Sequence, residues 1–303
     1  MIVRPRPTAF GLWFALRGSV LPTIAPRVLI LLAVSAGVVW LHHLTPQYFR
    51  DINPALFTIL GLALSIFLGF RNNTCYERWW EGRRQWGELI AITRSLLRET
   101  MTLLPDDPHL QRRVVNRTVA FAHVLRNQLR GTAGDATQER LLEGEWAWVA
   151  KSRNMPAAVL QAQAKELGQL FRQGMLSDIL YRLFSDKLSA MTDIQAACER
   201  LRSTPMPFAY SLLLHRTAWL FCLILPFGMV DNLGMGTPIL TAILAYAFFG
   251  LDALGEELEE PFGLSANGLP LDAMVRIIEI DAAEALRDAV LPGALQPEDF
   301  LLL

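Results

Sequence analysis

The chain has 303 residues, 52% of them hydrophobic, and a mean hydropathy of +0.28. This is more apolar than the core of a soluble protein of this length requires, so the composition favours a membrane protein. A formal net charge of -1 gives no electrostatic argument for a nucleic-acid partner, and the three cysteines lie too far apart for a disulfide framework or a zinc-binding pair.

The first 20 residues mix arginines with aromatic and apolar residues, in the order MIVRPRPTAFGLWFALRGSV. Arg17 interrupts the apolar part and no small-residue cleavage site follows, so we do not interpret the segment as a removed signal peptide. Its composition predicts a short segment that lies in the membrane interface, and a frayed leader is the alternative.

Four apolar runs are candidate membrane spans, at residues 28–41, 55–70, 208–230 and 238–251. Some are shorter than the roughly 20 residues that a lone spanning helix needs. Helices packed inside an oligomer extend through polar residues that do not face lipid, so four short spans fit better than four buried soluble helices.

Basic residues orient these spans. Four arginines precede the first run, and four more lie between residues 71 and 84, whereas the short connections within the two pairs of runs carry one arginine and none. The positive-inside rule then predicts that both termini and the long middle segment are cytoplasmic.

The middle, residues 79–205, has apolar residues at intervals of three and four, which is typical of amphipathic helices. Pro105, the GTAGD turn and the Asn154-Met155-Pro156 step separate the helices. We therefore predict an all-α membrane protein with four transmembrane helices and a large helical cytoplasmic region in one continuous body. Its expected parts are two membrane helices at about 25–84, cytoplasmic helices at 85–205, two membrane helices at 206–255 and a cytoplasmic segment at 256–303.

Small residues recur along the second apolar run. Gly61, Ser65 and Gly69 fall at every fourth position and form one flat strip along a helix. Such a strip allows a neighbouring helix to approach closely.

A bulky apolar stripe lies beside the small one. Leu62, Ile66 and Phe70 also recur at every fourth position, and the polar stretch RNNTCYERWW follows without a proline or a glycine-rich turn. A helix that keeps its register from apolar into polar sequence is typical of a pore-lining helix that enters a wet vestibule. Packing of the stripe against lipid or another helix is the alternative.

Two motifs resemble the bestrophin family. SIFLGFRNNTCYERWWEGRRQWGELI is similar to the family's glycine-phenylalanine step into Arg-Trp-Trp, and EEPFG is similar to its proline-phenylalanine-glycine step after the last membrane helix. The resemblance implies a homopentamer whose second helices line one pore, with Leu62, Ile66 and Phe70 at an apolar neck. It also implies a multi-pass protein of the bacterial inner membrane, since it points to the family's prokaryotic members.

The family has a second, cytoplasmic constriction formed by one side chain per subunit. By distance from the following helix, Leu180 matches that position, with Leu176 and Leu183 as alternatives. The acidic residues that bind calcium in animal members are replaced by LSANGLPL at residues 264–271, so the resemblance does not imply calcium activation.

An apolar neck blocks ions when it loses its water. Because it carries no formal charge, it does not by this means distinguish cations from anions. The resemblance to prokaryotic members favours cations such as sodium and potassium, and a chloride channel of the same architecture is the alternative. Asp252 and Glu256 share a helix face and are candidate vestibule charges. Pairing of this acidic face with Arg71, Arg78 or Arg94 is the other interpretation.

A membrane enzyme or secondary transporter is the alternative of another class. No HExxH, GxSxG, P-loop or GxGxxG pattern is present, so no catalytic residue or cofactor is predicted. His215 lies in the third run near its cytoplasmic start and is expected to reach the interface. His42 and His43 have no acidic residue spaced to complete a metal site, and no metal is predicted. The expected partners are lipids, permeant monovalent ions and other copies of the chain.

Overall fold

The structure is a computed structural model that describes residues 1–4, 10–11, 15–45, 54–134 and 136–303. The regular secondary structure of these residues is helical, apart from isolated β-bridges near the two ends of the chain. They divide into two compact units. The membrane unit contains residues Arg4–Trp79 and Pro205–Glu260, and the polar unit contains Met1–Val3, Trp80–Thr204 and Pro261–Leu303.

Three helical stretches are long and apolar enough to cross a membrane, namely Leu21–Leu44, Ala55–Leu103 and Phe208–Glu259. The third stretch contains two helices, α9 (Phe208–Leu233) and α10 (Thr237–Glu259), joined by the 3-10 turn Gly234–Gly236. With α2 (Leu21–Leu44) and α3 (Pro54–Leu103), these helices contain all four predicted spans. The expected all-α membrane fold is confirmed.

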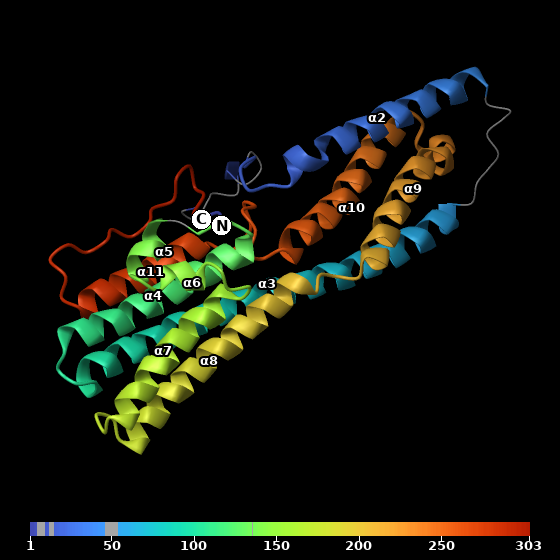
Figure 1. Cartoon of the computed structure of the whole chain (residues 1–303). Helices are drawn as coiled ribbons and strands as arrows, with labels where there is room; N and C mark the ends of the chain where they lie inside the picture. Colours follow the sequence, from blue (N-terminus) through green and yellow to red (C-terminus); the bar gives the residue numbers. More distant parts are fainter. Residues whose placement is uncertain (5–9, 12–14, 46–53, 135) are drawn as a thin grey trace. The chain divides into compact units, whose positions relative to one another are not determined.

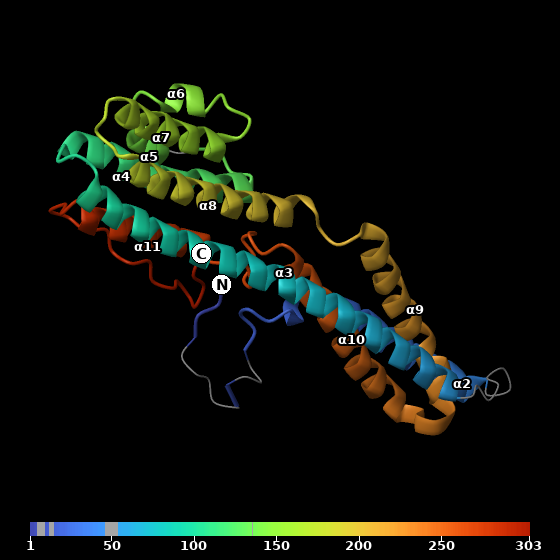
Figure 2. The same ribbon diagram turned by 90° about the horizontal axis from the view of Figure 1, so that it is seen from below.

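The membrane unit is built from α2, α9, α10 and the N-terminal part of α3, as Figures 1 and 2 show. Its interior contains Ile24 of α2, Leu68 of α3, Phe221 of α9 and Phe249 of α10, all buried. The rings of Phe221 and Phe248 meet edge to face at 5.3 Å between centroids. Since lipid is as apolar as these side chains, such close packing is what holds the helices of this unit to one another.

The polar unit is a bundle whose longer helices are α4 (Pro108–Arg130), α7 (Met155–Arg172), α8 (Asp178–Ser203) and α11 (Leu271–Ala285), with the short α5 (Ala136–Leu141) and α6 (Trp146–Val149). In Figures 1 and 2, α7 and α8 run side by side, and both α7 and α11 pack on α4. Of the predicted separators, Pro105 and the turn after Arg130 lie outside the helical ranges. Asn154 also lies outside, whereas Met155 and Pro156 begin α7.

Capping residues explain where these helices begin and end. The carboxylate of Asp107 accepts hydrogen bonds from the backbone N–H groups of His109 and Leu110 at the start of α4. Asn154 caps α7 and Ser177 caps α8 in the same way. Gly131 ends α4 with φ +68°, a left-handed conformation that glycine adopts without steric cost.

A buried ion-pair group joins helices of the polar unit. The Arg117 guanidinium bonds to Glu145 at 2.8 Å and to Glu166. Burial acts to lower the pKa of Arg117, but these hydrogen bonds raise it above its ordinary value, so the group stays charged. Burial also raises the pKa of Cys198 to about 12, which keeps that thiol protonated.

The two ends of the chain meet in the polar unit, where Ile2 forms a β-bridge with Leu301. Residues 5–9 and 12–14 of the predicted interfacial segment lie outside the described residues, and its position in the interface stays a prediction. One continuous body for residues 1–303 stays a prediction.

Candidate functional site

The side of α3 that carries the predicted neck residues is exposed in the chain. Leu62, Ile66 and Phe70 have 62%, 48% and 64% of their surface accessible, although all three are apolar. At about 100° per residue they lie within about 80° of one another around the helix. The helix therefore presents an unpacked apolar stripe, which is the property that the predicted neck requires.

The opposite face of α3 packs inside the membrane unit. Leu64, Leu68, Arg71 and Cys75 are all buried, at alternating intervals of four and three. The small-residue strip behaves differently along its length. A Cβ on Gly61 would lie 3.1 Å from the Phe221 ring, so only that end of the strip serves helix packing within the chain, while Ser65 and Gly69 are exposed.

The exposed stripe continues into polar residues. Asn73 and Glu77 fall on the same side of α3 as Ile66, by the same helical geometry. Both are exposed, and the Asn73 side-chain amide donates to the Glu77 carboxylate at 2.9 Å. Glu77 makes no ion pair within the described part of the chain. Glu77 is thus the first charged residue along the stripe after Phe70.

The candidate vestibule charge Asp252 is a paired, buried group. It is 1% exposed, and its Oδ1 accepts from Arg71 Nη1 at 2.5 Å, where Arg71 is itself 2% exposed. His215 Nδ1 lies 2.7 Å from the other carboxylate oxygen, and Arg27 lies 4.0 Å from it. Asp252 therefore pairs with Arg71, as the interpretation of paired charges predicted, and its carboxylate neutralises the guanidinium inside the unit.

Two of the three predicted arginine partners contact the acidic end of α10, and the third does not. Arg71 also lies 3.7 Å from Glu259, and Arg78 donates to the Glu259 backbone carbonyl at 3.5 Å. Arg94 instead bonds to Asp281 at 2.8 Å, within the polar unit. Glu256 is exposed and has no hydrogen bond or ion pair among the described residues.

The structure supplies a partner for two histidines. The His215 ring is held by Asp252 and is partly exposed, and its reach to the interface stays a prediction. His42 and His43 lie in the last turn of α2. Asp231 of α9 supplies the acidic neighbour that sequence spacing did not reveal, with 2.7 Å between His42 Nε2 and a carboxylate oxygen.

The segment predicted to form the cytoplasmic constriction is the start of α8. Leu180 is half-buried, as is Leu183, and Leu176 is 3% exposed and packs in the interior. Ile179, the neighbour of Leu180, is 81% exposed. A side chain that narrows a passage must project from its subunit, so exposure favours Ile179 over the predicted Leu180.

Comparison of the sequence with known protein families identifies the family of this chain. The family described as Bacterial/Fungal Bestrophin protein matches residues 1–284 of the chain. The chain belongs to the bestrophin family. Its motifs are therefore those of a bestrophin, as the resemblance predicted.

The similarity to individual relatives covers almost the whole chain. The Voltage-dependent anion channel-forming protein mll4386 of Mesorhizobium japonicum is 42% identical over 300 residues, which are 99% of this chain and 96% of the relative. The Voltage-dependent anion channel-forming protein YneE of Escherichia coli K12 is 41% identical over 303 residues, with 98% of each chain covered. The crystal structure of a bacterial bestrophin homolog from Klebsiella pneumoniae superposes with a TM-score of 0.85, at 38% identity, over 88% of this chain and 100% of that one.

These similarities identify a membrane ion channel rather than an enzyme. The expectation of no enzymatic activity is confirmed, and the alternative of a membrane enzyme is wrong. The relatives' names give no support to cations, because they specify anion channels.

Sequence reasoning missed two exposed residues of this bestrophin. Glu77 could have been found by extending the stripe of Leu62, Ile66 and Phe70 by two more helical turns. Ile179 could not, since the choice between it and Leu180 depends on which side of α8 packs.

Proposed function

We propose that this bestrophin is a homopentameric channel for small monovalent ions, with Leu62, Ile66 and Phe70 of each subunit forming an apolar neck. The observation that carries the proposal is the exposure of these three side chains on a membrane helix whose opposite face is packed. Exposed apolar side chains in line with exposed polar ones suit a passage shared by several copies better than they suit lipid.

The neck acts as a gate because it offers ions neither charge nor strong acceptors. An ion passes only if it keeps its hydration shell or if the neck widens. A narrow apolar neck can also lose its water and so block the current without any blocking segment. Buried Arg71, already neutralised by Asp252, adds no free charge to the passage.

We infer that the channel prefers cations, and Glu77 supports this inference. Its carboxylate is exposed on the neck's own side of α3 and has no arginine or lysine partner in the described parts of the chain. Five such carboxylates around a fivefold axis raise the local concentration of cations and lower that of anions. The names of the relatives favour the opposite sign, so an anion channel is the second candidate.

The reversal potential under a potassium chloride gradient tests the sign. With purified protein in planar bilayers, the reversal potential of the current is expected to shift towards the potassium equilibrium potential. The Glu77→Gln variant is expected to lower the cation-to-anion permeability ratio by roughly threefold or more. Reversal towards the chloride potential would refute the cation preference and leave the channel itself intact.

Glu139→Gln is the matched control for this measurement. Glu139 is exposed on α5 and has no ion pair among the described residues, so its substitution removes the same charge from another helix. An equal change in permeability ratio for both variants would mean that general surface charge, and not Glu77, sets the preference.

A second constriction at Ile179 is also proposed, in place of Leu180. Ile179→Ala is expected to raise single-channel conductance by about twofold or more, because a ring of exposed isoleucines narrows the path. Leu180→Ala should leave conductance near the parent value and lower the melting temperature, since Leu180 is half-buried. The reverse pattern in bilayer recordings would restore Leu180 as the constriction.

We further propose a bacterial inner-membrane location with both termini in the cytoplasm. The arginines before the first span and after the second support this orientation. Labelling of single cysteines at the chain ends in intact cells tests it, and labelling by an impermeant reagent added outside would contradict it.

A further inference from the structure

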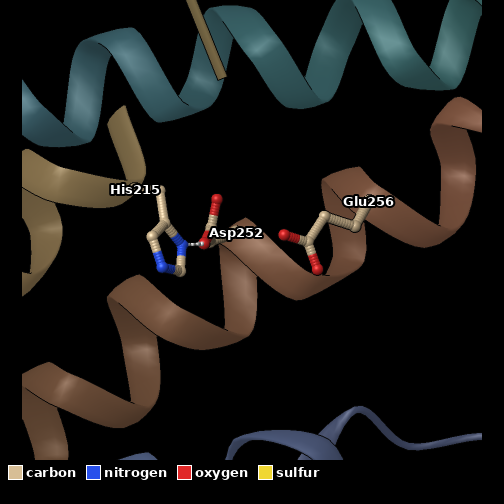
Figure 3. Close-up of side chains that lie close together, drawn as sticks. All are labelled: His215, Asp252 and Glu256. Atoms are coloured by element: carbon tan, nitrogen blue, oxygen red, sulfur yellow. Dashed lines mark hydrogen bonds and ion pairs between the residues drawn. The ribbon is translucent and has the colours of Figure 1, made fainter. Parts of the chain in front are cut away.

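Three potential metal ligands converge in the membrane unit. His215 of α9 and Asp252 and Glu256 of α10 each bring one ligand atom to a place where these atoms all lie within 4.8 Å of one another. Figure 3 shows the imidazole facing the Asp252 carboxylate, with the Glu256 carboxylate directed back along α10 towards it. Asp252 and Glu256 are four residues apart, which places them on one face of the helix.

The two oxygens of the Asp252 carboxylate have different neighbours. Arg71 bonds to Oδ1 at 2.5 Å, whereas Oδ2 is hydrogen-bonded to His215 Nδ1 at 2.7 Å, a bond that a metal ion held by both groups would replace. Carboxylates that bind metals are commonly oriented by such an outer hydrogen bond to their other oxygen. The buried guanidinium of Arg71 therefore holds Oδ2 in position towards the imidazole.

Carboxylates and guanidinium groups both surround the cluster. Arg71 and Arg27 approach the site from α3 and α2, and the carboxylates of Asp252, Glu256 and Glu259 come from α10. Arg78 also donates to the Glu259 backbone carbonyl, so three carboxylates and three guanidinium groups surround the cluster. Glu256 is the exposed ligand and has no arginine partner among the described residues.

The donor set selects the class of metal. One imidazole nitrogen with two carboxylates suits zinc, which takes mixed nitrogen and oxygen ligands and keeps a fourth position for water. Calcium and magnesium prefer shells of oxygen alone. We propose that His215, Asp252 and Glu256 form a zinc site between α9 and α10, a role that goes beyond ion conduction.

Zinc binding by the purified full-length chain tests the proposal. After removal of metals with a chelator, zinc is titrated in detergent against a chromophoric zinc indicator. Glu256→Gln is expected to weaken zinc affinity by about tenfold or more, because it removes one of three protein ligands. Glu256 makes no bond in the described structure, so this variant keeps the fold. Unchanged affinity in Glu256→Gln would overturn the proposal.

Glu260→Gln is the matched control. Glu260 is exposed, follows α10 directly and makes no ion pair in the described residues, so its loss removes the same charge one turn beyond the cluster. Its zinc affinity should equal that of the parent chain. Equal weakening in both variants would show a diffuse charge effect and refute a defined site.

The position and class of the ion are tested separately. Anomalous scattering at the zinc edge should place the ion between His215 and Asp252, and a peak only at His42 and Asp231 would contradict the assignment. Calcium at the same concentration should not displace zinc, and displacement would overturn the choice of metal. These measurements use no ion flux, so their failure is distinct from failure of the channel proposal.

Discussion

Ile66→Ala is expected to raise the current through the channel by roughly tenfold. The substitution removes the middle apolar ring of the proposed neck, widens it and lowers the cost of wetting it. A barrier lowered by about 1.4 kcal/mol is enough for a tenfold change in rate. Single-channel recording in planar bilayers measures the effect, with open probability and conductance reported separately.

Ile243→Ala is the matched control for this prediction. Ile243 is an exposed isoleucine on α10, outside the α3 stripe, so the same atoms are removed from a different surface. Its current should equal that of the parent chain. An Ile66→Ala channel no more conductive than the Ile243→Ala channel would show that the stripe of Leu62, Ile66 and Phe70 does not gate ions.

Asp252→Ala is expected to destabilise the chain by about 3–5 kcal/mol, because it leaves a buried guanidinium without its closest partner. Arg71 is 2% exposed, and its other carboxylate neighbour, Glu259, is 3.7 Å away. The double variant Arg71→Met with Asp252→Ala should recover much of the loss, since it removes the buried charge along with its partner. Thermal unfolding in detergent measures all three proteins.

An exposed ion pair supplies the comparison. Arg182 and Asp186 lie 3.9 Å apart on α8 and are 84% and 71% exposed, so Asp186→Ala should change stability by less than about 0.5 kcal/mol. If Asp252→Ala unfolds at the same temperature as Asp186→Ala, then the Arg71 and Asp252 pair does not stabilise the membrane unit.

Much of this fold was predictable because its signals are local. Uninterrupted apolar runs identify membrane helices, since each run must satisfy its backbone within itself. Asn154 and Ser177 start helices by accepting hydrogen bonds from backbone N–H groups three residues away. The family was recognisable for the same reason, as its longest motif is one continuous stretch of α3.

The candidate site was only partly predictable. The stripe of Leu62, Ile66 and Phe70 follows from spacing, but Leu64 and Leu68 are equally apolar and equally regular. Only packing within the membrane unit distinguishes the two faces, because Leu64 and Leu68 belong to its buried core. At the start of α8, exposed Ile179 and half-buried Leu180 are adjacent residues that lie about 100° apart around the helix. The periodicity of one sequence does not show which of the two is exposed.

By itself, the sequence determined the family, the all-helical membrane architecture and the three residues proposed for the neck. Only the tertiary structure decided that those residues are exposed, that Asp252 neutralises Arg71 across 181 residues of sequence, and that His215 joins the same cluster. The physical reason is that helix formation depends on neighbours along the chain. Burial and charge pairing depend on helices that meet only after folding.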